Sequence, residues 1–175
     1  MNIMVINATP RKGSTYQMKE LFLEILGNEH DVSEYTLPDA FPAFCTNCRS
    51  CVCDGLNSCP HAKYTVPLWE AIIASDLIIL ILPSYATEIP KQLQELLNHY
   101  YARFMADSAE AKMISKQAVV ISREIGQQPL NEVVQSIKES LDEWGITQIH
   151  VIKQHSFKIK CERLAAKIEL INLLN

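Results

Sequence analysis

The sequence predicts an α/β fold, a three-layer, doubly wound arrangement in which helices cover both faces of a five-stranded parallel sheet. Short runs typical of strands recur five times along the 175 residues, and segments with helical periodicity separate them. Strands that alternate with helices form parallel sheets with right-handed crossovers. The length suits one domain and the sequence has no repeat or linker, so residues 1–175 are predicted to form a single domain.

The five predicted strands differ in how their apolar residues are spaced. The runs at 2–7 and 77–82 are continuously apolar, as expected of strands buried on both faces. The run at 31–37 alternates polar and apolar residues, which favours a strand at the edge of the sheet. Two further strands are predicted at 117–122 and 147–153.

The predicted helices have recognisable start and stop signals. The first begins near Ser14 or Thr15, both good capping residues, and ends before Gly27. Pro90 suits the first position of a later helix that continues past Leu97. The other helices are predicted at 66–74, 130–144 and 161–174.

The composition excludes several classes of partner. Hydrophobic residues make up 48% and charged residues 21% of the chain, an ordinary balance for a globular protein. The net charge is −4 and there is no basic stripe or tail, which argues against a nucleic-acid or anionic-membrane partner. The longest apolar run is far too short to span a bilayer. The chain starts directly with a strand-like run, so we expect no signal peptide and a cytoplasmic location.

The loop after the first strand has the residue types of a phosphate site. Backbone amides at a helix start and the helix dipole favour an anion, and segment 9–15 lies just there. Thr9, Ser14 and Thr15 add hydroxyl groups, and Arg11 adds a planar guanidinium suited to phosphate. The alternative is a plain strand-to-helix turn with a serine cap and solvated basic side chains. The composition of the loop leaves both interpretations open.

Segment 7–15, Asn-Ala-Thr-Pro-Arg-Lys-Gly-Ser-Thr, resembles the Gly-Ser-Pro-Arg-x-x-Gly-Asn-Thr signature of NADPH-dependent FMN reductases and iron–sulfur flavoproteins. The resemblance implies a flavodoxin-like fold with strand order 2-1-3-4-5. It also implies that the loop binds the phosphate of FMN through Thr9, Arg11, Gly13, Ser14 and Thr15. The chain departs from the signature at Ala8, where the family has its first glycine, and at Ser14, where it has asparagine.

The loop after the third strand, which begins Pro83-Ser84-Tyr85, resembles the Pro-x-Tyr loop of the same family. The resemblance implies that the flavin ring lies between this loop and the segment after the fourth strand. The expected ring contacts are Pro83, Ser84, Tyr85, Ala86, Thr87 and Ser122. Tyr85 is also a candidate for stacking on a substrate. The alternative is an ordinary loop with an anchoring tyrosine. In the following helix the chain has Asn98-His99 where relatives often have Asp-Arg, which puts the usual helix contacts in doubt.

Segment 38–64 is predicted as a cysteine-rich insertion, since it has turn residues and no clear period. With a large core and no export signal, reduced thiols or a metal site are favoured over disulfides. The spacing of Cys45, Cys48, Cys51 and Cys59, with a proline after the last, resembles the ligand pattern of 4Fe–4S sites. The alternatives are a lid with free or redox-active thiols, as in some relatives, and a zinc site with His61 as a ligand.

The resemblance implies an FMN-dependent oxidoreductase that passes electrons from NAD(P)H through FMN to a quinone, a flavin or another small acceptor. The cofactor carries such chemistry, so no side chain is predicted as a catalytic acid or base. Two alternatives remain open: an iron–sulfur flavoprotein electron carrier with a 4Fe–4S cluster, and a non-redox flavodoxin-fold regulator or metal-binding module. The relatives also imply a homodimer or homotetramer.

Overall fold

The computed structural model describes residues 1–9, 11–26, 30–37, 39–41, 45–83, 88–99, 116–123 and 130–154. The predicted helix at 161–174 lies outside these residues. The helix near Pro90 was predicted to begin at this proline and to continue past Leu97. Instead Pro90 is its N-cap, and the helix ends at Leu97, because the backbone of Asn98 (φ −90°, ψ 4°) leaves the helical region. None of the described helices is long and apolar enough to cross a membrane.

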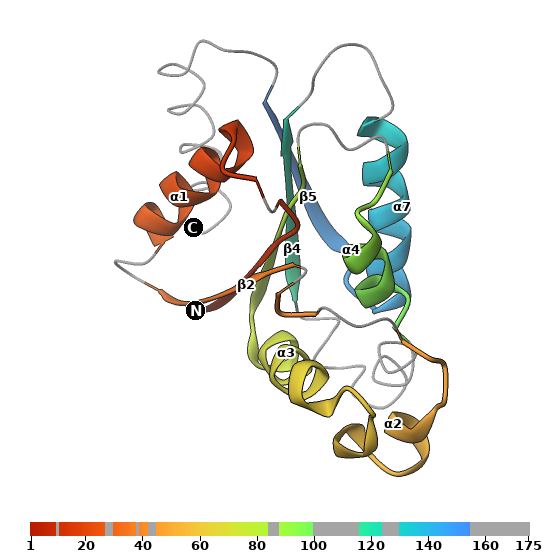
Figure 1. The fold of residues 1–175 in the computed structure, drawn as a ribbon. Coiled ribbons are helices and arrows are strands. Elements are labelled where there is room, and N and C mark those ends of the chain that lie inside the picture. Colours follow the sequence, from red (N-terminus) through yellow and green to blue (C-terminus); the bar gives the residue numbers. More distant parts are fainter. Residues whose placement is uncertain are drawn as a thin grey trace.

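The strands form one parallel sheet of order β2-β1-β3-β4-β5, as predicted (Figure 1). Each predicted strand is present with bounds that differ by no more than one residue. The observed strands are β1 (Asn2–Asn7), β2 (Asp31–Thr36), β3 (Leu77–Ile81), β4 (Gln117–Arg123) and β5 (Gln148–Gln154). All five residues of β3 are buried, whereas β2 lies at the edge and has no fully buried residue.

The described helices are α1 (Ser14–Leu26), α2 (Ser50–Cys53), the 3-10 helix η1 (Leu56–Ser58), α3 (Ala62–Ala74), α4 (Lys91–Leu97) and α7 (Leu130–Glu143). The prediction for α3 was wrong at its start, since the helix begins four residues before position 66. Pro67 favours a start next to it, but the structure keeps this exposed proline inside the helix. The extra turn is stabilised at its start by the carbonyl of His61, which accepts the N–H and the hydroxyl of Thr65 at 3.0 and 3.2 Å.

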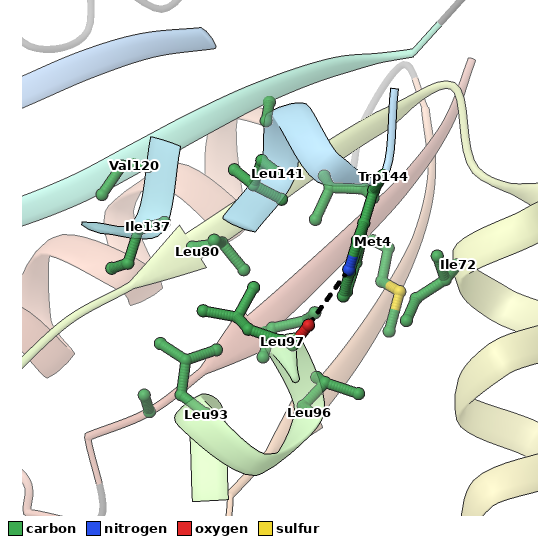
Figure 2. Close-up of a cluster of buried hydrophobic side chains, with 14 of the residues drawn as sticks. Met4, Ile72, Leu80, Leu93, Leu96, Leu97, Val120, Ile137, Leu141 and Trp144 are labelled. Carbon is green, nitrogen blue, oxygen red and sulfur yellow. Dashed lines mark hydrogen bonds between the residues drawn. The ribbon is translucent and has the colours of Figure 1, made fainter. Parts of the chain in front are cut away.

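The sheet separates two apolar clusters, one on each face (Figure 1). On one face α1 packs Met18, Phe22 and Leu26 against the strands. On the other face α3, α4 and α7 bury a larger set of side chains, some of which are drawn in Figure 2. Because both faces are covered, the polar groups that could bind a ligand are confined to the edges of the sheet.

An aromatic group with a histidine fills the larger cluster. The ring of Trp69 lies 5.2 Å from that of Trp144 and 5.8 Å from that of His99, centroid to centroid. The indole N–H of Trp144 donates to the carbonyl of Leu97 at 3.1 Å, which joins α7 to the end of α4 (Figure 2). Burial, with a smaller contribution from the charge of His61, lowers the pKa of His99 to about 4. His99 is therefore a neutral core residue.

Replacement of His99 by leucine should make the free energy of unfolding less dependent on pH between 6.5 and 4. The unfolded chain takes up a proton near pH 6.5, while the folded chain resists it down to about pH 4. The stability that comes from this difference is complete above pH 6.5 and is lost as the pH falls towards 4. Urea unfolding at pH 7.5 and 4.5 should show that the wild type loses about 2 to 3 kcal/mol more than His99→Leu. Equal losses in both proteins would show that His99 is protonated in the fold.

Candidate functional site

The strands β1, β3 and β4 end at the same edge of the sheet. Hydrogen bonds hold the ends level: the N–H of Ala8 donates to the carbonyl of Ile81, and that of Leu82 to the carbonyl of Ile121, both at 2.9 Å. The order of the strands reverses here, since the chain passes from β1 outwards to β2 and from β3 in the opposite direction to β4. Ligands of doubly wound folds bind in the crevice that such a reversal opens.

The start of α1 presents unsatisfied amides at this edge. The carbonyl of Gly13 accepts the N–H of Gln17 at 3.0 Å, so the helix begins directly after Gly13. The N–H groups of residues 14–16 have no acceptor within the helix, and the helix dipole adds positive potential there. A Cβ atom at Gly13 would meet no atom within 4 Å, so the space in front of the helix is open. This geometry is that of an anion site.

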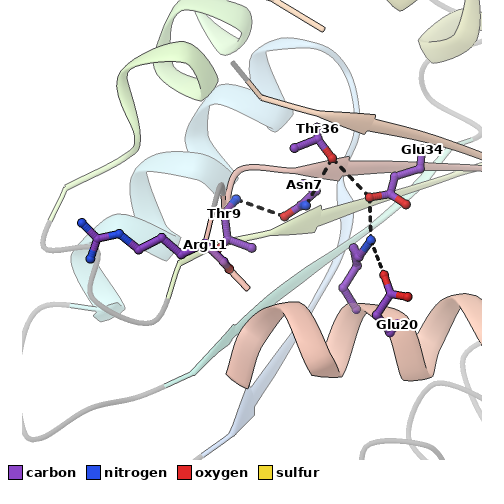
Figure 3. Close-up of polar contacts among 7 residues, drawn as sticks. Asn7, Thr9, Arg11, Glu20, Glu34 and Thr36 are labelled. Atoms are coloured by element: carbon purple, nitrogen blue, oxygen red, sulfur yellow. Dashed lines mark hydrogen bonds and ion pairs between the residues drawn. The ribbon is translucent and has the colours of Figure 1, made fainter. Parts of the chain in front are cut away.

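Thr9 shapes the loop from inside. Its N–H donates to Oδ1 of Asn7 at 3.0 Å, and its hydroxyl donates to the carbonyl of Arg11 at 3.4 Å. Both of its donors are therefore used within the loop, and the residue is buried. The side chain of Arg11 is exposed and extends away from these contacts (Figure 3). Arg11 can thus approach a phosphate from the solvent side.

Two hydroxyl groups predicted from the sequence as cofactor contacts are buried without a partner. Thr15, in the first turn of α1, is 3% exposed and Ser122, near the end of β4, is 0% exposed. Neither oxygen makes a hydrogen bond in the part of the chain that the structure describes. A buried hydroxyl left unpaired costs about 1 to 3 kcal/mol, so such groups call for an explanation. A ligand with phosphate and hydroxyl oxygens at this edge would satisfy both, and the residues fit FMN in this respect.

The remaining predicted flavin contacts are only partly described. Pro83 is buried two residues after the end of β3, at the same edge as Thr9, Thr15 and Ser122. Ser84, Tyr85, Ala86, Thr87 and the side chain of Ser14 lie outside the described residues.

A polar network beneath the loop was missed in the sequence. The side-chain amide of Asn7 donates to the hydroxyl of Thr36 at 3.3 Å, and this hydroxyl donates to Oε1 of Glu34 at 3.3 Å (Figure 3). The same oxygen accepts from Nζ of Lys19 at 2.7 Å. A signal was present, because Asn7 ends an apolar strand and Lys19 lies within the apolar stripe of α1.

Lys19 remains charged although its side chain is only 3% exposed. Burial alone would lower the pKa of Lys19, but hydrogen bonds and charge interactions with Glu20 and Glu34 outweigh burial and raise it. Its Nζ lies 2.6 Å from Oε1 of Glu20 and 4.4 Å from the centre of the Tyr16 ring. This buried cation fixes α1 against β2.

The four cysteines predicted as ligands act on one another. Burial raises the pKa of the Cys51 thiol, and the charges of Cys59, Cys45 and Cys48 raise it further. The exposed Cys53 is not among these partners. All five cysteines of the loop are free thiols.

Backbone amides donate to two of these sulfur atoms. The N–H of Asn47 donates to Sγ of Cys45 and that of His61 to Sγ of Cys59, each at 3.4 Å. Hydrogen bonds to the ligand sulfurs are among the features that set the reduction potential of an iron–sulfur cluster. Asn47 and Arg49, on either side of Cys48, have φ values of 56° and 64°, a left-handed conformation that costs energy and often marks functional loops.

The described residues do not form a site for one metal ion. No group of three or more histidine, cysteine or acidic side chains among them is arranged to hold such an ion. In a 4Fe–4S cluster each thiolate binds a different iron, so its ligands are spaced more widely than those of a single ion.

Solved structures show where this fold recurs. The chain is similar to an FMN-dependent NADH-azoreductase from Bacillus anthracis str. Ames Ancestor, with 13% identity, a TM-score of 0.72 and 99% of both chains covered. For an NAD(P)H:quinone oxidoreductase from Methanothermobacter marburgensis the identity is 16% and the TM-score 0.66, with 100% of this chain and 98% of that one covered. An NADPH-quinone reductase from P. pentosaceus has 13% identity, a TM-score of 0.66 and 97% of both chains covered. At these identities the likeness shows the fold alone.

No curated protein matches the sequence. Residues 1–160, however, match the family described as NADPH-dependent FMN reductase, which extends well beyond the N-terminal motifs. The chain therefore belongs to the NADPH-dependent FMN reductase family, and its enzyme class is that of the NAD(P)H-dependent oxidoreductases.

Proposed function

We propose that the chain binds FMN at the edge of the sheet formed by the ends of β1, β3 and β4, and uses it to pass electrons from NAD(P)H to a small acceptor. The observation that carries the proposal is the pair of buried hydroxyls of Thr15 and Ser122, which have no hydrogen-bond partner among the residues that the structure describes. They lie on two of the elements that meet at this edge. When bound, FMN supplies the two-electron redox chemistry of the reaction.

The phosphate end is assigned to the start of α1. The amides of residues 14–16 and the hydroxyl of Thr15 donate hydrogen bonds to the phosphate oxygens, and Arg11 adds a positive charge from the solvent side. Gly13 leaves room for the phosphate to approach the start of α1. A Cβ atom at this position would meet no other atom within 4 Å, so a larger side chain would occupy this open space. These residues bind and orient the cofactor and transfer no proton.

The ring end is assigned to the loop from Pro83 to Thr87 and the segment after Ser122. Ser122 is suited to the ribityl hydroxyls, because its own hydroxyl is buried without a partner. The substrate proposed to lie against the exposed part of the ring is a planar molecule, a quinone or a second flavin, with Tyr85 as its stacking partner. The similar solved structures include an azoreductase and a quinone oxidoreductase, which supports an acceptor of this kind.

The first experiment compares FMN binding by the wild type and Thr15→Val. Valine keeps the shape of threonine and removes the donor, so the dissociation constant for FMN should rise about 10-fold. The cofactor-free variant should be more stable than the wild type, by up to about 1 to 3 kcal/mol, because it loses a buried hydroxyl that has no partner among the described residues. Titration calorimetry and urea unfolding measure the two quantities.

Thr65→Val is the matched control, because the buried hydroxyl of Thr65 is bonded to the carbonyl of His61. This variant should lose stability and keep its affinity for FMN. A wild type that binds no FMN would refute the proposal, and an unchanged affinity in Thr15→Val would place the phosphate elsewhere. Loss of the flavin colour when NADPH or NADH is added without oxygen tests the electron donor.

A second candidate function, an iron–sulfur flavoprotein with a 4Fe–4S cluster, is supported by the four interacting thiols and the two N–H donors to sulfur. In this alternative the cluster takes electrons from the flavin, and direct use of NAD(P)H is not required.

Iron analysis of protein purified without oxygen separates the two functions. An iron–sulfur flavoprotein should contain about four irons per chain in the wild type and in Cys53→Ser, and much less in Cys51→Ser. Cys53 is the control, since it lies in the same loop outside the interacting set. A wild type free of iron would leave the cysteine loop as a lid with reduced thiols.

A further inference from the structure

We propose that Glu34, acting through Thr36 and Lys19, is a positioning residue that sets the preference of the site for phosphorylated flavin. The inference rests on the proposed function, because it concerns the phosphate end of the FMN site. Glu34 lies on the edge strand β2 and touches neither the loop nor the first turn of α1. Glu34 is connected to the loop through Thr36 and Asn7, and to α1 through Lys19.

The first connection runs to the loop. The carboxylate of Glu34 can only accept hydrogen bonds, so the single proton of the Thr36 hydroxyl is directed towards it. The oxygen of Thr36 is then an acceptor for the amide nitrogen of Asn7. This fixes the orientation of the amide, and its oxygen is left facing the N–H of Thr9. The charge on Glu34 thereby determines which way the buried amide of Asn7 points.

The second connection runs to the helix. The ammonium of Lys19 binds the same carboxylate oxygen at 2.7 Å. Lys19 is four residues after Thr15, so the two side chains lie on the same face of α1, one turn apart. With Lys19 buried and anchored, the helix is held in the rotation that keeps the Thr15 hydroxyl buried at its start. One carboxylate therefore fixes both walls of the phosphate site, the loop at Thr9 and the helix at Thr15. Figure 3 shows the contacts that link Glu34 through Thr36 to Asn7 and Thr9.

The test compares affinities for FMN and for riboflavin, which differ only in the phosphate. Thr36→Val keeps a β-branched side chain on β2 and cuts the connection to the loop. We expect it to weaken FMN binding about 5- to 10-fold and to leave riboflavin binding unchanged. Glu34→Leu, which cuts both connections, should reduce the preference further, and Glu34→Gln, which keeps an acceptor oxygen, should restore part of it.

Tyr35→Phe is the matched control, since it removes a hydroxyl on the same strand whose bond, to the carbonyl of Pro67 at 3.3 Å, lies outside the network. It should leave the ratio of the two affinities at the wild-type value. A Thr36→Val variant with an unchanged ratio, or with equal losses for both ligands, would overturn the inference while the FMN site stands. A wild type that binds FMN no better than riboflavin would instead refute the phosphate site and the inference together.

Discussion

The reversal of strand order between β1 and β3 is the constraint on which the site depends. These strands lie side by side, and the chain leaves them in opposite directions, which is the arrangement that opens a crevice for a ligand between their ends. The buried β3 holds the arrangement rigid, because both faces of the sheet are packed by helices. The loop at Thr9, the start of α1 and the end of β4 are thereby brought to one place.

Polar groups at this edge fall into two kinds, and the difference separates structure from function. Asn7, Thr9, Thr36, Glu34 and Lys19 satisfy one another, and their contacts hold the loop and α1 in place. Thr15 and Ser122 are fully buried and have no partner among the described residues. Satisfied groups need no ligand, whereas unsatisfied ones cost stability until a ligand binds. The hydroxyls of Thr15 and Ser122, which the described residues leave without a partner, therefore indicate where the ligand binds.

The sheet was predictable because each strand and helix has its own pattern of apolar residues within a short segment of the sequence. The strand order followed from the family resemblance. Thr15 and Ser122 could be named from motif and topology in the same way. The sequence signalled that Asn7 and Lys19 are polar residues in apolar surroundings, but it could not show their partners. Lys19 and Glu34 are 15 residues apart and Asn7 and Thr36 are 29 apart, and they meet only through the pairing of β1 with β2 and the packing of α1. Nor could the sequence show the extra turn of α3, where Thr65 donates two hydrogen bonds to the carbonyl of His61 and Pro67 lies inside the helix.

The central claim is that the start of α1 holds the phosphate of FMN. A crystal structure of the protein with FMN tests this most directly. The account predicts density for the phosphate at the amides of residues 14–16, with an oxygen within hydrogen-bond distance of the Thr15 hydroxyl. A phosphate bound away from this helix start, or a flavin lying outside the edge formed by β1, β3 and β4, would contradict it.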